Sequence, residues 1–203
     1  MPAAIQQSQM ESDRLSAIKT IDSEIRAIEE LKKSLDAESL TKALDFMQNS
    51  TGRIIITGMG KSGHIGKKIA ASLASTGTPS FFVHPAEASH GDLGMITDDD
   101  VVIAISNSGE SRELIDILNY CKRFGIKLIA ITKNQDSSLG KAGDVVLLLP
   151  NNGEACPLGL APTSSTTATL VLGDILTIRM IERKGFSKED FNDRHPGGKL
   201  GSI

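Results

Sequence analysis

The chain has 203 residues, and its 22 Lys and Arg against 25 Asp and Glu give a formal net charge of −3. Apolar residues make up 39% of the chain and aromatic residues only 3%. This length favours one domain with a sizeable core, since domains usually comprise about 100–200 residues. Nucleic-acid binders need excess positive charge or aromatic side chains that stack on bases, so the composition argues against a nucleic-acid partner.

No stretch of the sequence is typical of a membrane span or a secretion signal. The longest apolar runs, such as Val101–Ile105, have five residues, whereas a membrane-spanning helix needs about 20. Residues 1–13 are polar and lack the basic and apolar segments of a signal peptide. The two cysteines, Cys121 and Cys156, form no CxxC pair and fit reduced thiols. We therefore expect a cytoplasmic protein that does not associate with membranes.

The first 50 residues predict helices ahead of the main fold. Apolar residues spaced by three or four positions share one helix face; they are Ile18, Ile21, Ile25 and Ile28, with Leu15 and Leu35 extending the stripe. A second helical pattern spans Leu40–Met47. The long amphipathic helix could pack on its own domain or on another subunit, and the second alternative would make the protein an oligomer.

Short β-branched runs alternate with helical stretches from residue 53 to residue 185. The runs are continuously apolar, as in strands that are covered on both faces, and alternation with helices implies a parallel sheet. We predict a three-layer αβα sandwich with a five-stranded parallel sheet in the order 2-1-3-4-5. The predicted strands are Ile54–Thr57, Phe81–Val83, Val101–Ser106, Leu128–Thr132 and Val145–Leu149, and the predicted helices are His64–Thr76, Ser111–Phe124, Ser137–Ala142 and Thr166–Lys184.

The whole chain, 1–203, then forms a single domain in three parts. Residues 1–50 are the N-terminal helices and residues 53–185 the α/β core. Residues 186–203 contain several glycines and a proline, which predict an irregular tail. This tail is either a linker or a segment that lies over an active site.

A glycine-rich segment, GMGKSG at residues 58–63, follows the first strand. It matches the dinucleotide pattern GxGxxG, but the strand end about 20 residues on carries no acidic ribose partner. A P-loop is excluded because Ile55 occupies its first glycine position. The segment is therefore either a turn without a ligand or a phosphate site, where backbone N–H groups at a helix N-terminus attract an anion beside Lys61 and Ser62.

A second polar loop, SNSGES at residues 106–111, follows the third strand. Helix capping explains one such residue, whereas this loop has four in six positions. In the predicted strand order the first and third strands are neighbours, so both loops meet where ligands of open parallel sheets bind. We expect them to converge on one phosphate; the candidate contacts are Ser62, Ser106, Asn107, Ser108 and Ser111.

Three further polar positions are less informative alone. His84, Glu87 and His90 could suggest a metal site, but a structural site needs four ligands and no cysteine lies near them, so we predict a polar active-site wall without metal. Glu154 precedes two prolines and is either a rigidly placed carboxylate or a solvated loop residue. His195 before Pro-Gly-Gly is uninformative by itself.

Taken together, the motifs resemble the sugar isomerase (SIS) family, and within it the D-arabinose 5-phosphate isomerases. The resemblance extends from about residue 10 to the C-terminus. Its carriers are GMGKSGHIG (58–66), HPAEASHGDLGMI (84–96), ISNSGES (105–111), EACPLGLAPTSSTTATLVLGD (154–174) and HPGGKLG (195–201). The first and third are general to the SIS fold, and the last two are more specific.

The resemblance implies a tetramer without organic cofactor that interconverts D-ribulose 5-phosphate and D-arabinose 5-phosphate, toward Kdo for lipopolysaccharide or capsule. It places the family's active-site residues at Lys61, His90, Glu113, Glu154 and His195, and its phosphate contacts at the five residues given above. Typical members continue into two regulatory CBS domains, whereas this sequence stops at Ile203. We therefore expect the isomerase domain alone, as a natural or a shortened form, without nucleotide regulation through CBS domains.

Isomerisation through an enediol suggests roles for these residues. Glu154 would be the base if burial raises its pKa toward neutral, and His195 would open the sugar ring. Lys61 would stabilise the enediolate or the phosphate, and Glu113 would position a histidine of a neighbouring subunit. The sequence permits these roles to be exchanged.

Three other functions stay open at this point. A non-catalytic sugar-phosphate sensor would need the serine loops but not Glu154 or His195. An isomerase of another sugar phosphate, such as a ketohexose 6-phosphate or a heptulose phosphate, would differ in the size of its pocket. A dehydrogenase would bind NAD.

Overall fold

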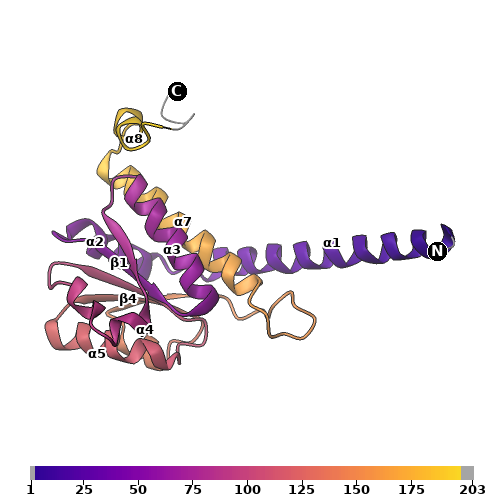
Figure 1. Ribbon diagram of the computed structural model, residues 1–203, viewed down its shortest axis with the longest axis horizontal. Coiled ribbons are helices and arrows are strands. Elements are labelled where there is room, and N and C mark those ends of the chain that lie inside the picture. Colours follow the sequence, from indigo (N-terminus) through magenta and orange to yellow (C-terminus); the bar gives the residue numbers. More distant parts are fainter. Residues whose placement is uncertain (1–2, 198–203) are drawn as a thin grey trace.

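A five-stranded sheet between two layers of helices forms the body of the protein (Figure 1). The computed structural model describes residues 3–197. The strands are β1 (Ile54–Gly58), β2 (Ser80–Val83), β3 (Val101–Ile105), β4 (Lys127–Thr132) and β5 (Val145–Leu148). All neighbouring strands are parallel, in the order β2-β1-β3-β4-β5. The predicted fold class and strand order are confirmed.

Helices cover both faces of this sheet. They are α1 (Ala3–Ser34), α2 (Ala37–Asn49), α3 (Gly60–Ser75), α4 (Pro85–Ala88), α5 (Ile115–Phe124), α6 (Ser138–Ala142), α7 (Ser164–Lys184) and α8 (Lys188–Arg194), with 3-10 turns η1 (Asp92–Met95) and η2 (Arg112–Leu114). Ile54 and Ile56 pack with α2, α3 and α7, whereas Ile55 packs with α4, α5 and α6. Because successive side chains of a strand point to opposite faces, burial of both faces requires the continuous apolar runs.

The C-terminal segment differs from the prediction. Instead of an irregular tail, residues 188–194 form α8, whose N-terminus is closed by a capping box. The Ser187 hydroxyl accepts the Asp190 N–H (3.1 Å), and the Asp190 carboxylate accepts the Ser187 N–H (2.9 Å). The glycines and proline that suggested a tail follow this helix, and residues 198–203 lie outside the described part of the chain.

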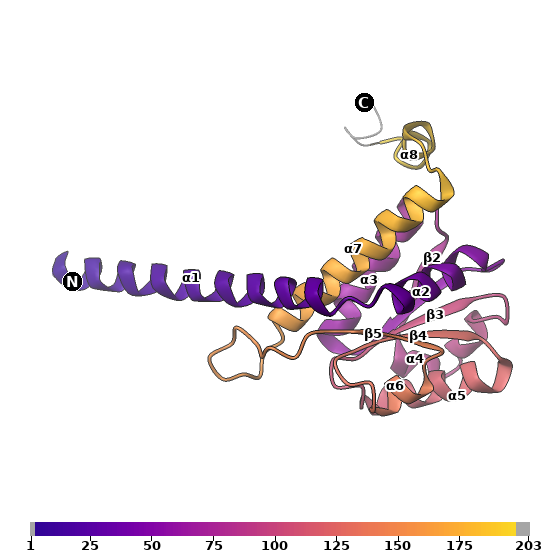
Figure 2. The same ribbon diagram turned by 180° about the vertical axis from the view of Figure 1, so that it is seen from behind.

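Helix α1 projects from the body as a long arm (Figures 1 and 2). Its 32 residues extend over about 48 Å. Its C-terminal half packs on α7 through the buried side chains of Ser23, Ala27 and Leu31. The predicted isoleucine stripe lies on another face and is exposed, at 37–57% for Ile18, Ile21, Ile25 and Ile28. Leu35 does not extend the stripe, because it follows α1 and packs against the core.

The structure also describes the two cysteines and the apolar character of the helices. Cys121 and Cys156 are both free thiols, one buried and one half-buried. Of the helices within residues 3–197, none combines the length and the apolar character that crossing a membrane requires.

Candidate functional site

The glycine-rich loop lies at the carboxyl end of β1. Gly58 pairs with Ile105, so the loops after β1 and β3 leave the sheet side by side. Gly60 adopts a φ of +58°, which only glycine readily allows, and lets α3 begin directly after the strand. No side chain caps this helix, so the N–H groups of its first turn remain available beside Lys61, which is exposed, and Ser62, which is half-buried.

The serine loop folds back on itself next to this helix start. The hydroxyls of Ser106 and Ser111 are 2.8 Å apart, and Ser106 also accepts the Gly109 N–H (3.1 Å). Ser108 is exposed, and its hydroxyl accepts the N–H two residues on (3.2 Å). The Asn107 side-chain oxygen is buried without a hydrogen-bond partner in the described residues. The loop therefore gathers polar groups that a ligand could contact.

Glu154 lies against the N-terminus of α7. Its Oε2 accepts three hydrogen bonds, from the Thr163 N–H (2.7 Å), the Thr163 hydroxyl (3.1 Å) and the Ser165 N–H (3.2 Å). Oε1 accepts none from the residues that the structure describes. Oε2 is therefore fixed by the helix, and Oε1 is the oxygen left for chemistry.

The expectation that burial raises the pKa of Glu154 toward neutral is wrong for this structure. Burial acts in that direction, but hydrogen bonds from Ser165 and Thr163 to the ionised form outweigh it and lower the pKa of Glu154 below its ordinary value. The residue is therefore a carboxylate at neutral pH.

A cavity of about 270 Å³ joins Glu154 to the serine loop. Its polar lining consists of Asn107, Lys133, Asn151, Asn152, Glu154 and Ser165. Of these six residues, the sequence predicted Asn107 and Glu154 but not Lys133, Asn151, Asn152 or Ser165. Lys133 could have been found, because it directly follows β4 at the same sheet edge, and its N–H donates to the Asn107 carbonyl (3.1 Å). Asn152 and Ser165 carried no signal beyond loop and cap composition.

The remaining predicted catalytic residues do not line this cavity. His90 and Glu113 are both exposed; they belong to segments around α4 and η2, which pack together on the other face of the sheet. Lys61 is near the helix start described above. One chain thus brings Glu154 to the serine loop without His90 or Glu113.

His195 follows α8, which comes after the C-terminal end of α7 (Figure 1), whereas Glu154 accepts hydrogen bonds at the N-terminus of α7. Helix α7 has 21 residues, or about 30 Å, and His195 follows α8 beyond it. Its ring stacks on Phe191 with 3.8 Å between ring centroids, and its Nδ1 is 2.8 Å from the Phe191 carbonyl oxygen. Over residues 186–197, the C-terminal segment therefore does not cover the active-site cavity of its own chain.

The segment after β2 also carries the residues considered for a metal. Within residues 3–197, no group of three or more His, Cys, Asp or Glu side chains is placed to hold a metal ion. The His84 Nδ1 is buried without a hydrogen-bond partner in the same range, and Glu87 and His90 are exposed. A polar wall remains the prediction for this segment.

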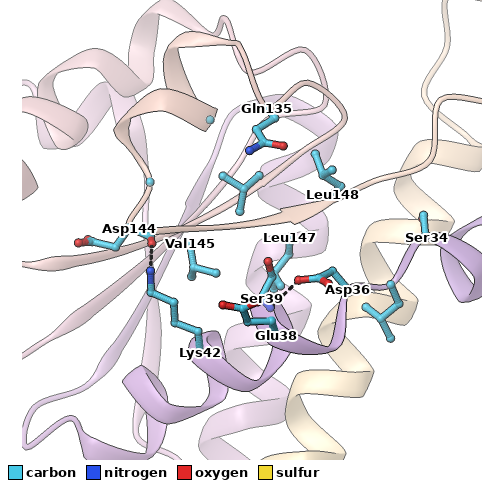
Figure 3. A pocket seen from close by; sticks show the side chains of 14 residues that line it. Ser34, Asp36, Glu38, Ser39, Lys42, Gln135, Asp144, Val145, Leu147 and Leu148 are labelled. Atoms are coloured by element: carbon cyan, nitrogen blue, oxygen red, sulfur yellow. Dashed lines mark hydrogen bonds between the residues drawn. The ribbon is translucent and has the colours of Figure 1, made fainter.

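A larger cavity of about 540 Å³ lies between β5 and the start of α2 (Figure 3). It contains none of the predicted site residues. Several of its polar groups have partners within the chain, since the Lys42 Nζ donates to the Asp144 carbonyl (2.7 Å) and Asp36 accepts the Ser39 N–H (2.7 Å). The smaller cavity is the candidate site because two of the predicted site residues, Asn107 and Glu154, line it.

Comparison with known families gives a match to the part of the chain that contains the candidate site. Residues 47–179 match the family described as SIS domain. The chain belongs to the SIS domain family. The match contains all five strands, α3, the serine loop, Glu154 and most of α7, and thus every residue that lines the candidate site.

Two curated relatives of this SIS chain are named arabinose 5-phosphate isomerase KdsD. The relative from Pseudomonas aeruginosa is 57% identical over 186 residues, covering 92% of this chain and 57% of the relative. The relative from Francisella tularensis is 56% identical over 189 residues, covering 92% of this chain and 58% of the relative. The chain thus spans less than three fifths of the length of either relative.

Solved structures share the SIS fold over most of their length. The Escherichia coli CFT073 protein c3406, in complex with arabinose 5-phosphate, superposes with a TM-score of 0.86 at 43% identity, covering 91% of this chain and 98% of that one. Vibrio vulnificus NanR, complexed with ManNAc-6P, has a TM-score of 0.77 at 20% identity, covering 95% of this chain and 71% of that one. The second likeness concerns the fold alone.

Proposed function

We propose that this SIS chain is an aldose–ketose isomerase that interconverts D-ribulose 5-phosphate and D-arabinose 5-phosphate through an enediol. The observation that carries the proposal is the cavity in which an ionised Glu154 faces the same space as the serine loop. The names and identities of the KdsD relatives make them the best guide to the substrate, and the arabinose 5-phosphate complex of c3406 supports the same sugar phosphate.

The substrate phosphate would bind between the loops after β1 and β3. The uncapped first turn of α3 offers N–H groups, and the exposed Lys61 adds a positive charge. The five polar candidates around it are Ser62, Ser106, Asn107, Ser108 and Ser111. Binding there leaves the carbonyl end of the sugar to extend into the cavity toward Glu154.

Glu154 would move the proton. Its free Oε1 takes the proton from C2 of the open aldose, the C2–H electrons form the C1–C2 double bond, and the carbonyl oxygen O1 takes up a proton to give the enediol. Glu154 then returns its proton to C1 while O2 loses its proton and becomes the carbonyl oxygen of the ketose, so that the proton gained by O1 is balanced by the one lost from O2. The carboxylate is ionised at neutral pH and can accept this proton, although its lowered pKa makes it a weaker base than an ordinary glutamate. Lys61 would stabilise the negative charge on the oxygens of the intermediate or the phosphate. No organic cofactor or metal is required by these steps.

The complete site would need more than one chain. His195, which we propose opens the sugar ring, is about the length of α7 from Glu154 in the same chain, so a neighbouring subunit would supply it. The exposed isoleucine stripe of α1 provides an apolar face for such a neighbour. His90 and Glu113, on the other side of the sheet, would then serve a site shared between subunits. We propose a homotetramer.

The biological setting follows from the same resemblance in the motifs. The proposed reaction supplies arabinose 5-phosphate for Kdo, in lipopolysaccharide or capsule. The free thiols of the chain suit the reducing cytoplasm, where we place the protein without a membrane or nucleic-acid partner.

The test is turnover of D-arabinose 5-phosphate without any added cofactor, followed by proton NMR, with a ketohexose 6-phosphate and a heptulose phosphate as alternative substrates. We expect the pentose phosphate to be converted fastest. Conversion of another sugar phosphate alone would make the protein a different isomerase. Thermal stabilisation by D-arabinose 5-phosphate without turnover of any sugar would instead indicate a binding module.

A further inference from the structure

We propose that Thr163 is a positioning residue that holds the Glu154 carboxylate in one orientation and reserves its Oε1 for proton transfer. The proposal rests on the proposed function, because it assumes that Glu154 is the base. It assigns a role to a residue that contacts the base but not the reacting atoms.

Thr163 contacts Glu154 through both its backbone and its side chain. Its N–H and its hydroxyl lie 2.7 and 3.1 Å from the same oxygen, Oε2. The Ser165 N–H, at 3.2 Å, is the third donor to this oxygen. Two of the three hydrogen bonds on Oε2 thus come from one residue, and all three come from the first residues of α7 and its N-cap.

The direction of the hydroxyl hydrogen bond is fixed by a fourth contact. The Ala155 N–H donates to the Thr163 Oγ1 (2.8 Å). Because an N–H can only donate, this bond occupies a lone pair of the hydroxyl and leaves its proton for Glu154. Thr163 must therefore act as a donor to the carboxylate, which favours the ionised form of Glu154.

The same contacts close the loop that carries the base. Thr163 is hydrogen-bonded to both Glu154 and Ala155. These hydrogen bonds connect the two ends of the loop formed by residues 155–162. The tip of the loop is exposed, with Leu158 at 79% and Leu160 at 78%, and gives the carboxylate little support of its own. The hydrogen bonds of Thr163 therefore set the position of Glu154 relative to the cavity.

The charges around Glu154 are few. Lys133 lines the same cavity from the end of β4, and Cys156 lies two residues along the same loop. From α1, Glu24 approaches α7 but is hydrogen-bonded to Thr167 (3.0 Å). Thr163→Val leaves all of these groups in place, so its effect isolates the hydroxyl.

The experiment compares three substitutions on α7 and its N-cap in the full chain. Thr163→Val removes the hydroxyl, Thr163→Ser retains it, and Thr177→Val is the matched control. The buried Thr177 hydroxyl bonds only to the helix carbonyl of Gly173 (2.9 Å), so its loss tests a structural effect of the same chemical change. We measure kcat, KM and the pH profile, and the ionisation of the Glu154 carboxyl carbon by ¹³C NMR.

We expect Thr163→Val to lower kcat about 10–100-fold, as for a misplaced catalytic group, with KM changed less than threefold or so. The pKa of Glu154 should rise toward its ordinary value in this variant and stay low in Thr163→Ser, which should recover most of the activity. Thr177→Val should shift neither the pH profile nor the ¹³C titration.

An unchanged Glu154 titration in a folded Thr163→Val would overturn the positioning role, whatever its activity. An equal loss of activity in Thr163→Ser and Thr163→Val would also overturn it. Only the serine variant retains the hydroxyl, so an equal loss would be due to side-chain shape and not to the hydrogen bond. If wild type turns over no sugar phosphate, the proposed function fails. The ¹³C titration still decides whether Thr163 fixes the carboxylate.

Discussion

At the scale of single residues, the two carboxylate oxygens of Glu154, the proposed base, are unequal. Oε2 is saturated by donors from α7, whereas Oε1 is not. Glu154→Gln preserves the shape of the side chain but cannot accept the proton. We expect it to lose turnover by about 10²–10⁴-fold while it still binds the sugar phosphate, measured by steady-state kinetics and thermal shift. Turnover close to wild type would remove Glu154 from the role of base.

The serine loop should act on binding rather than on chemistry. Combining Ser108→Ala with Ser111→Ala removes two hydroxyls, one of which is 2.8 Å from that of Ser106. We expect the KM for D-arabinose 5-phosphate to rise roughly tenfold or more with kcat largely retained, because binding lost equally from ground and transition states appears in KM. A change in kcat alone would contradict the phosphate assignment.

The lowered pKa of Glu154 also has a consequence for stability. A carboxyl with a lower pKa in the folded than in the unfolded state stabilises the fold above its ordinary value of 4.5, and this contribution is lost as the pH falls through the lower folded value. The Tm difference between wild type and Glu154→Gln should thus be largest near pH 7 and shrink as the pH falls below about 4.5. A difference that stays constant over this range would mean that the charge of Glu154 has no part in it.

Much of the site could be predicted from the sequence because its loops follow strands. The serine loop and the glycine-rich loop are short segments directly after apolar runs, so strand order alone brings them together. The ionisation of Glu154 could not be predicted, since it depends on hydrogen bonds from Thr163, nine residues away along a loop. Lys133, in contrast, was predictable, because it directly follows β4 at the edge of the sheet where the serine loop lies.

At the scale of elements, helix α1 exposes an apolar face in the single chain. Its isoleucine stripe is exposed, although Ser23, Ala27 and Leu31 already bind the helix to its own body. The 3–4 spacing predicted the helix and its apolar face correctly. It could not tell which face packs on the same chain, because small residues such as Ser23 and Ala27 form that contact.

Two adjacent residues of α1 test the role of the stripe. Ile25→Asp places a charge on the exposed apolar face, and Arg26→Asp places the same charge one residue on, at an exposed polar position. We expect Ile25→Asp to dissociate the proposed oligomer and to lower turnover at least about tenfold, since a carboxylate is costly to bury. Arg26→Asp should retain the assembly.

Sedimentation velocity gives the assembly state of both variants, and circular dichroism checks that they fold. An assembled and active Ile25→Asp variant would mean that the stripe faces solvent in the working protein.

In the C-terminal part of the chain, residues that favour a helix lie directly before residues that favour irregular structure. Glycine and proline after residue 195 suggested an irregular tail, but the Ser187 and Asp190 capping box favours the helix α8 before them.

Strand ends were predicted to within one residue, since apolar runs end where burial ends. Helix starts were less accurate, and α3 begins four residues before the predicted His64 because Gly60 and its neighbours join the first turn.

At the scale of the whole molecule, one chain separates groups that the chemistry needs together. Glu154 is hydrogen-bonded at the N-terminus of α7, and His195 follows α8, which lies beyond the other end of α7 (Figure 2). A working site would therefore combine chains. Coexpression of differently tagged Glu154→Gln and His195→Asn chains tests this arrangement. Random mixing should restore up to about a quarter of the wild-type activity in the doubly tagged oligomers, because some sites then receive both intact residues.

Each variant alone should be nearly inactive in the same assay. Doubly tagged oligomers without restored activity would mean that both residues act within one chain, and an active His195→Asn variant would mean that His195 has no part in the reaction.

The most direct measurement mixes the protein with D-arabinose 5-phosphate in D₂O, with no cofactor, and follows the sugar by proton NMR. We predict that the ketose forms with deuterium from solvent at the exchanged carbon, because the proton would pass through Glu154 and an enediol. Ketose formed without any deuterium would contradict a solvent-exchanging base. The absence of ketose would contradict the proposed isomerase itself.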